Sequence, residues 1–186
     1  MSDYQIKDLI MKRVIFLDFD GVLNTGNYTK KLIAEGKPYR DEFGELFDPE
    51  AIHNLQTVLD TTPDALLVIT SSWKDVYGPA AIRRLWKERG FPGKIHSMTR
   101  MCMPAFLNED SDPTLALIKG PEVEQWLEEH EMKGCRYVII DDVEDFLPKQ
   151  KKHLVKINPN TGITAKDAKR AIKLLCNEET CNRKTR

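Results

Sequence analysis

Several features that would place a protein in a special class are missing from this sequence of 186 residues. No stretch approaches the roughly 18 consecutive apolar residues of a membrane-spanning helix, so we expect no membrane segment. The net charge is only −1, so no overall positive field indicates a nucleic-acid partner. Residues 1–13 contain acids and no apolar core, which is not typical of a signal peptide, and we expect a cytoplasmic protein.

Cysteine is scarce and does not form a metal-binding pattern. The four cysteines, Cys102, Cys135, Cys176 and Cys181, show neither a C-x-x-C spacing nor an accompanying pair of histidines, so we do not expect a zinc site. Reduced thiols in a cytoplasmic protein are the simpler interpretation. No internal repeat or low-complexity tract is present either. The length, with 41% apolar and 31% charged residues, is ordinary for one globular domain over residues 1–186.

What the sequence does contain is a buried strand that ends in acids. Residues 14–17 are four consecutive apolar β-formers, which is typical of a strand buried on both faces of a parallel sheet. Asp18 and Asp20 follow directly, and Gly21 allows a sharp turn after them. Open α/β sheets bind ligands beyond the carboxyl ends of their strands, so these two carboxylates are candidate functional groups.

Two later apolar runs end in the same manner. The run at 65–69 ends in Thr70, Ser71 and Ser72, and the run at 137–140 ends in Asp141 and Asp142. Further strands are expected at 94–99 and 153–157, and helices at about 49–61, 79–89, 122–130 and 165–176. This alternation predicts a Rossmann-like α/β fold, a parallel sheet with helices on both faces and the 13–18 strand at its centre.

Parallel strands bring their carboxyl ends to one edge of the sheet, so the acids should gather there. A cluster of carboxylates is costly unless a cation neutralises it. Oxygen ligands select a hard cation, and Mg²⁺ typically takes one or two carboxylates together with substrate phosphate. The sequence therefore predicts a magnesium site at this edge.

A polar segment at about 25–47 separates the first strand from the helix that Asp48 and Pro49 begin. It is too long for an ordinary βα loop, and long inserts beside active sites commonly act as lids or specificity elements. We expect a small cap with a short helix at 28–35. A surface excursion without a role is the alternative.

These residues resemble the motifs of the haloacid dehalogenase (HAD) superfamily. Residues 18–23, DFDGVL, resemble its first motif, DxDG[TV], and Ser71 resembles the second. Lys119 is similar in position to the third-motif lysine, and Asp141 with Asp142 resembles the acidic fourth motif. The resemblance spans residues 13 to about 175. The phrases FLDFDGVLN and ITSSWK further resemble a small-cap branch found in some bacterial and RNA-repair contexts.

The resemblance implies a role for each residue. Asp18 would attack phosphorus and form an aspartyl-phosphate, and Asp20 would act as the general acid and base. Ser71 or Thr70 would bind a phosphate oxygen, and Lys119 would neutralise its charge. Mg²⁺ would be held by Asp18, the carbonyl of Asp20 and one fourth-motif acid.

Three assignments stay open at this level. Asp142 or Asp141 is the direct metal ligand, with Asp145 as a further acid of the motif. Lys133 competes with Lys119 for the phosphate-neutralising role. Trp73 has no evident polar partner and is expected to serve packing.

The implied function is Mg²⁺-dependent hydrolysis of a phosphate monoester. Asp20 disfavours dehalogenase chemistry, which does without a second acid, and ATPase behaviour, where this position is usually Thr. A phosphorylated small molecule is the expected substrate. The alternatives are a nucleic-acid end carrying a phosphate and a non-catalytic binding protein on the same scaffold.

Overall fold

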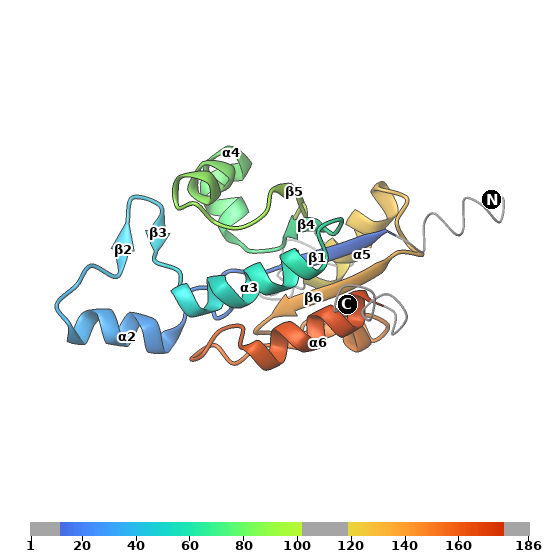
Figure 1. The fold of residues 1–186 in the computed structure, drawn as a ribbon. Helices are drawn as coiled ribbons and strands as arrows, with labels where there is room; N and C mark the ends of the chain where they lie inside the picture. Colours follow the sequence, from blue (N-terminus) through green and yellow to red (C-terminus); the bar gives the residue numbers. More distant parts are fainter. Residues whose placement is uncertain (1–11, 102–118, 177–186) are drawn as a thin grey trace, which may run out of the picture.

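The computed structural model describes residues 12–101 and 119–176, and its centre is a five-stranded sheet (Figure 1). The strand order is β5-β4-β1-β6-β7, and every neighbouring pair is parallel. The predicted Rossmann-like parallel sheet, with the acid-ending strand β1 at its centre, is therefore confirmed. The strands are β1 Arg13–Leu17, β4 Leu66–Ile69, β5 Ile95–Met98, β6 Arg136–Asp141 and β7 Leu154–Lys156.

The central position of β1 explains its run of apolar residues. Successive side chains of a strand point to opposite faces of the sheet, so both faces of β1 must be covered. Ile15 and Leu17 pack in the cluster that includes Leu55 and Ala171, whereas Phe16 packs in the cluster that includes Trp126. An acid within this run would be buried without water, which is why the carboxylates begin only at the strand's end.

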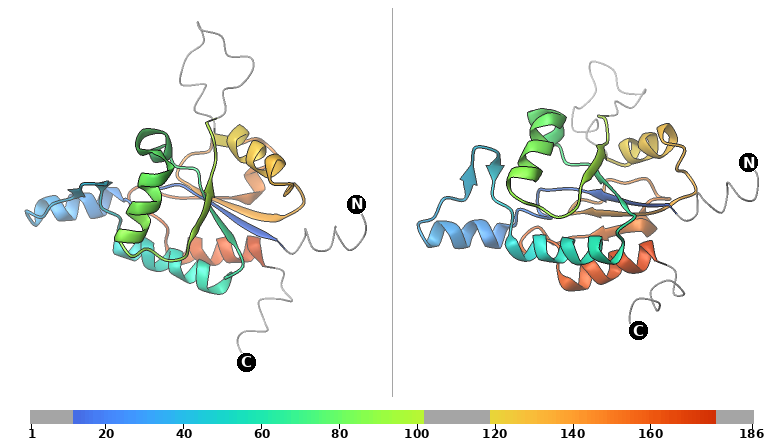
Figure 2. Two further views of the ribbon diagram at one scale, coloured as in Figure 1. Left: turned by 90° about the horizontal axis from the view of Figure 1, so that it is seen from above. Right: turned by 45° about the horizontal axis from the view of Figure 1, so that its top comes forward.

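Helices cover both faces of the sheet, as the alternating pattern predicted. Helices α3 (Pro49–Thr61) and α6 (Ala165–Leu175) lie side by side against one face (Figures 1 and 2). Helix α5 (Lys119–Glu129) packs in the apolar cluster of the other face. Asp48 caps α3 by accepting a hydrogen bond from the Glu50 backbone, as predicted. A 3₁₀ turn, η2 (Lys151–His153), precedes β7.

Helix α4 differs from the prediction of a helix at 79–89. It begins at Trp73 and runs to Glu88, with an interruption at Gly78. The glycine adopts φ +80°, a conformation open to glycine because it lacks a side chain, and Pro79 restarts the helix. The predicted helix begins only at Pro79, whereas the chain forms an additional helical segment before it that carries Trp73.

The 25–47 insert folds into a helix and a small hairpin at one end of the molecule (Figures 1 and 2). Thr25 is the N-cap of helix α2 (Gly26–Ala34). Its hydroxyl donates a hydrogen bond to Asp48, at the other end of the insert (2.9 Å). The hairpin strands are β2 (Arg40–Asp41) and β3 (Gly44–Glu45). The predicted short helix at 28–35 is present.

The hairpin is fixed to the body of the protein through Arg89, at the end of α4. Its guanidinium makes two hydrogen bonds to the Asp41 carboxylate, at 2.6 and 3.0 Å, and donates to the carbonyls of Gly44 and Glu45. The same group lies 5.2 Å from the centre of the Phe47 ring. Burial alone would raise the pKa of Asp41, but Arg89 and nearby backbone donors lower it. The described helices include none that is long and apolar enough to cross a membrane.

Candidate active site

The end of β1 places its two acids in different environments. Asp18 is 3% exposed, and its backbone donates to the carbonyl of Ile140, which keeps it in the sheet. Asp20 lies beyond it and is exposed. Gly21 turns the chain with φ +66°, and a Cβ there would lie 2.5 Å from the carboxylate of Asp142. The turn therefore requires glycine and brings the end of β1 against the end of β6.

Lys119 reaches this cluster from the first residue of α5. Its Nζ lies 2.7 Å from Oδ2 of Asp18 and 2.8 Å from Oδ2 of Asp141. Burial lowers the pKa of Lys119, but the charges of the two aspartates outweigh it and raise that pKa. Lys133, the competing lysine, is exposed and pairs with Glu128. The structure thus brings Lys119 to the acids, and Lys133 is paired elsewhere.

The start of α5 is held in place by backbone contacts. The Gly120 N–H donates to the carbonyl of Asp145 (3.1 Å), and buried Gln150 donates to the carbonyl of Gly120 (2.9 Å). A Cβ on Gly120 would lie 2.7 Å from the Leu147 nitrogen, so this approach requires glycine. The side chain of Asp145 is exposed, and it is not among the clustered acids. Its contribution is to anchor the helix that carries Lys119.

A buried ion pair braces the same helix against α4. Lys74 lies 3.2 Å from the Glu122 carboxylate, which also accepts a hydrogen bond from the Thr99 hydroxyl (2.6 Å). Buried charges persist in folded proteins when they are paired and hydrogen-bonded. The sequence analysis missed this group, because nothing in the spacing of the three residues indicates that they meet.

Three carboxylates meet at the edge of the sheet. One oxygen from each of Asp18, Asp141 and Asp142 lies within 4.8 Å of the others. Asp141 is fully buried, and its oxygens accept from Lys119 and from the backbone of Val143 (3.0 Å). No side chain within residues 12–101 and 119–176 donates a hydrogen bond to the carboxylate of Asp142, where only the backbone of Asp142 itself acts as a donor. Asp142 therefore has the freer oxygens for a metal ion.

The pKa values of the two fourth-motif acids record this crowding. Burial, followed by the charge of Asp18, raises the pKa of Asp141 to about 7, although Lys119 lowers it. The same two causes, in the same order, raise the pKa of Asp142. Both shifts disfavour the ionised forms, because the two acids are buried and lie beside the charge of Asp18. An all-oxygen donor set with a deficit of positive charge fits a hard divalent cation such as Mg²⁺.

The polar end of β4 lies beside Asp18. The Thr70 N–H donates to the carbonyl of Leu17 (2.9 Å), which sets Thr70 level with the start of the acid motif. Thr70 is 1% exposed, and its hydroxyl lacks a hydrogen-bond partner among the described residues. The Ser71 hydroxyl instead accepts from the Trp73 backbone (3.4 Å). Among the described residues, the buried hydroxyl without a partner at this edge is therefore that of Thr70.

Trp73 makes a contact that the sequence analysis did not predict. Its indole N–H donates to both carboxylate oxygens of Asp20, at 2.9 and 3.1 Å. The Asn24 amide donates to the same carboxylate at 2.7 Å. The expectation that Trp73 serves only packing is wrong, since α4 begins early enough to carry the ring to the turn that holds Asp20. The four-residue spacing of Asp20 and Asn24 was a readable signal, but the Trp73 contact spans 53 residues.

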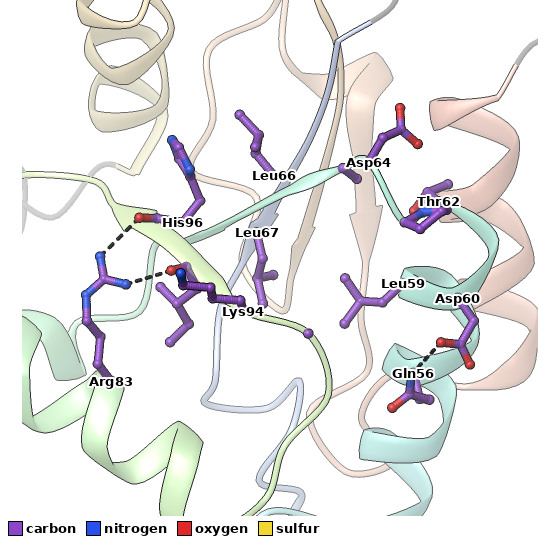
Figure 3. A pocket seen from close by; sticks show the side chains of 14 residues that line it. Gln56, Leu59, Asp60, Thr62, Asp64, Leu66, Leu67, Arg83, Lys94 and His96 are labelled. Carbon is purple, nitrogen blue, oxygen red and sulfur yellow. Dashed lines mark hydrogen bonds between the residues drawn. The ribbon is translucent and has the colours of Figure 1, made fainter.

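A separate cavity of about 660 Å³ lies at the other ends of the strands (Figure 3). Its lining includes the segments that lead into β4 and β5. Several polar side chains in it have partners: Arg83 donates to the carbonyls of Ile95 and His96, and Gln56 donates to Asp60. None of the predicted site residues lines it.

Comparison with known proteins agrees with the motifs. A family model described as "HAD domain in Swiss Army Knife RNA repair proteins" matches residues 14–168, which include the acidic cluster and the whole five-stranded sheet apart from Arg13. No curated protein and no solved structure matches the chain. The match covers well over half of the sequence and confirms the resemblance to the HAD superfamily. The chain belongs to the family of HAD domains found in Swiss Army Knife RNA repair proteins.

Proposed function

We propose that this protein is a Mg²⁺-dependent phosphomonoester hydrolase that forms an aspartyl-phosphate on Asp18. The observation that carries the proposal is the different environment of the two acids. Asp18 is buried against Lys119, within the acidic cluster, whereas Asp20 lies outside it and is exposed. A nucleophile needs a fixed, charge-neutralising site, and a general acid must reach the leaving group and water.

The first step transfers the phosphoryl group to the protein. A carboxylate oxygen of Asp18 attacks phosphorus, and the bond from phosphorus to the leaving oxygen breaks. The leaving oxygen keeps the electron pair and takes a proton from Asp20. The Lys119 ammonium balances negative charge on the phosphoryl oxygens from its position beside Asp18.

The second step releases phosphate. Asp20, now a carboxylate, takes a proton from a water molecule whose oxygen attacks the phosphorus of the aspartyl-phosphate. The bond between phosphorus and Asp18 breaks, which frees inorganic phosphate and restores both acids to their starting forms. The exposure of Asp20 supports this step, because water can reach the base.

The residues that would hold Mg²⁺ are Asp18, Asp142 and the backbone carbonyl of Asp20. Asp142 is favoured over Asp141 as the metal ligand, because one oxygen of Asp141 accepts a hydrogen bond from Lys119 and the other accepts one from the Val143 backbone. When bound, the ion would neutralise the clustered carboxylates and polarise a phosphoryl oxygen. Thr70 is favoured as the phosphate-binding hydroxyl, because it is the unpaired buried group beside Asp18.

The substrate class that the family suggests is a phosphorylated RNA end. Exposed apolar and aromatic side chains lie in two segments, Tyr39 in the insert and Val76 with Tyr77 on α4. The Tyr77 ring contacts the ring of Trp73, whose indole reaches Asp20. Aromatic side chains bind unpaired bases by stacking, which suits a single-stranded end. A phosphorylated small molecule, the expectation from the sequence, is the alternative.

Two assays separate these possibilities. Purified protein with Mg²⁺ should release phosphate from p-nitrophenyl phosphate, and no release with any substrate would contradict the hydrolase. A panel of oligoribonucleotides with 3′- or 5′-phosphates should then be compared with mononucleotides and sugar phosphates at equal concentration. A higher kcat/KM for an oligoribonucleotide supports the RNA end, whereas a higher value for a metabolite supports the small molecule.

A further inference from the structure

The geometry points to a positioning role for Trp73: its indole N–H holds the Asp20 carboxyl group where, in its protonated form, it can protonate the leaving group. This inference rests on the proposed function, because it assigns a role in the reaction at the same site. The indole nitrogen lies 2.9 and 3.1 Å from the two oxygens of Asp20. One donor therefore spans both oxygens and fixes the plane of the carboxylate.

Asp20 needs such a tether because it lies on an exposed turn. A side chain in water samples several rotamers, and a general acid must stay within hydrogen-bond reach of the atom it protonates. Asn24 supplies a second donor, and its own oxygen accepts from the Gly21 N–H (3.1 Å). Asn24 holds Asp20 from within the turn, whereas Trp73 holds it from another element.

The Trp73 ring is itself held rigidly. It is 8% exposed, and its centroid lies 5.8 Å from those of Phe19 and Phe47 and 5.6 Å from that of Tyr77. Phe19 is the residue between the two catalytic acids, so the packing of the ring is tied to the motif that it serves. A donor locked by packing loses little entropy when it binds the carboxylate.

An indole suits this task better than a charged donor. Its N–H donates and cannot accept, and it does not titrate in the ordinary pH range. It can hold an oxygen of Asp20 whether the acid is protonated or ionised, and it does not take the proton that Asp20 must deliver. Lys119 makes the opposite kind of contact with Asp18, where a fixed positive charge suits a nucleophile that stays ionised.

The contact also links the insert to the reaction. A Cβ on Gly44, in strand β3, would lie 3.0 Å from the Trp73 ring, and Phe47 ends the same insert. The returning half of the insert therefore forms one wall of the slot that holds the indole. On this basis the 25–47 insert contributes to the position of the acid, in addition to any contact with substrate.

The test compares leaving groups in Trp73→Phe. Breaking the ester of p-nitrophenyl phosphate needs little help from an acid, because p-nitrophenolate is stable, whereas an alkyl phosphate such as glycerol 2-phosphate needs the proton. General acids typically contribute about 10²–10⁴-fold, so we expect kcat/KM to fall about tenfold or more for the alkyl ester and less than about twofold for p-nitrophenyl phosphate. An equal loss for both esters, or no loss for either, would overturn the inference.

Trp86→Phe is the matched control. Trp86 belongs to the same aromatic cluster and stacks on Phe19, but its indole donates to the carbonyl of Pro92. Its replacement should affect both esters equally. An Asp20→Ala background gives a second criterion: Trp73→Phe should lower the alkyl-ester kcat/KM no further there. A further loss in that background would show a structural role and would contradict the inference.

A measurement on folded protein covers the case in which Trp73→Phe does not fold. The chain has three tryptophans, and the indoles of Trp86 and Trp126 donate to other partners. In a proton–nitrogen correlation spectrum, Asp20→Asn should move the Trp73 indole resonance and leave the other two in place. An unmoved Trp73 resonance would overturn the inference. If the wild-type protein showed no phosphatase activity, the proposed function would be refuted. The contact between Trp73 and Asp20 would still be tested by the shift of the indole resonance.

Discussion

The two ends of the sheet differ in how their polar groups are satisfied. At the carboxyl ends of the strands, Asp18, Asp141 and Asp142 crowd together and the Thr70 hydroxyl has no partner among the described residues. At the amino ends, beside a cavity of about 660 Å³, the Thr62 hydroxyl and the Arg83 guanidinium both have backbone partners. Unsatisfied polar groups cost stability, so their retention at one end supports the proposal that a ligand binds there.

The clustered acids and the unpaired hydroxyl identify this site better than cavity volume does. The cavity in Figure 3 has a large volume, but its Arg83 and Gln56 side chains already bond to the backbone and to Asp60. The acidic edge instead holds raised pKa values at Asp141 and Asp142, which a cation would relieve. Matched substitutions at the two ends of the sheet test whether only the acidic end supports activity.

The largest difference is expected between two aspartates. Asp18→Asn removes the proposed nucleophile and should lower kcat on p-nitrophenyl phosphate by at least about 10³-fold, since the proposed mechanism assigns the covalent bond to no other group. Asp60→Asn makes the same change at the cavity, where Gln56 is the partner of Asp60, and should leave kcat within about twofold. Comparable losses in the two variants would remove the distinction between the ends.

Removal of the metal ion should be nearly as severe. Chelator should abolish turnover, and Mg²⁺ should restore it and raise the melting temperature, because the ion binds the folded protein alone. Asp142→Asn should raise the Mg²⁺ concentration needed for half-maximal activity more than Asp141→Asn does, given the hydrogen bonds that occupy Asp141. Turnover that is insensitive to chelator would exclude the metal.

An intermediate effect is expected for lysines. Lys119→Ala should lower kcat/KM by about 10²–10³-fold, the usual loss for a group that stabilises transition-state charge. Lys94 lines the cavity at the other end, and Lys94→Ala should be nearly silent in the same assay. Mg²⁺ titrations of both variants would show whether a loss arises through the metal. An unchanged kcat/KM in Lys119→Ala would exclude its assigned role.

The smallest effects are expected for two threonines, one of which should affect activity and the other stability. Thr70→Val should lower kcat/KM about ten- to a hundredfold but leave stability unchanged or slightly higher, because it replaces an unpaired buried hydroxyl. Thr62→Val should cost about 1 kcal/mol of unfolding free energy, since its hydroxyl donates to Val58, and should spare activity. Ser71→Ala tests the alternative hydroxyl and should cost less than about threefold in kcat/KM.

The fold could be predicted from the sequence because it follows from local patterns of residues. Four apolar residues before Asp18 predicted a central buried strand, and the pattern Asp48-Pro49 predicted where α3 begins. The acids at the ends of β1 and β6 could be placed together for the same reason, since parallel strands share an edge. The family match confirms the fold and the superfamily, and the roles of individual residues remain proposals.

The contacts that the sequence did not predict join residues that are far apart in the chain. Pro79 indicated the start of a helix. In the structure Gly78 and Pro79 instead interrupt a helix that has already begun at Trp73. The early start brings the indole to Asp20 across 53 residues, and no periodicity encodes such a distance. The choice between Thr70 and Ser71 likewise depended on which hydroxyl the fold leaves without a partner.

The central claim is that Asp18 becomes phosphorylated during turnover. The direct measurement is to quench the protein with acid during reaction with p-nitrophenyl phosphate and Mg²⁺, digest it, and locate the added phosphoryl group by mass spectrometry. We expect the group on the peptide that contains Asp18, and its absence in Asp18→Asn. Turnover without a phosphorylated residue, or a phosphoryl group on another residue, would contradict the account.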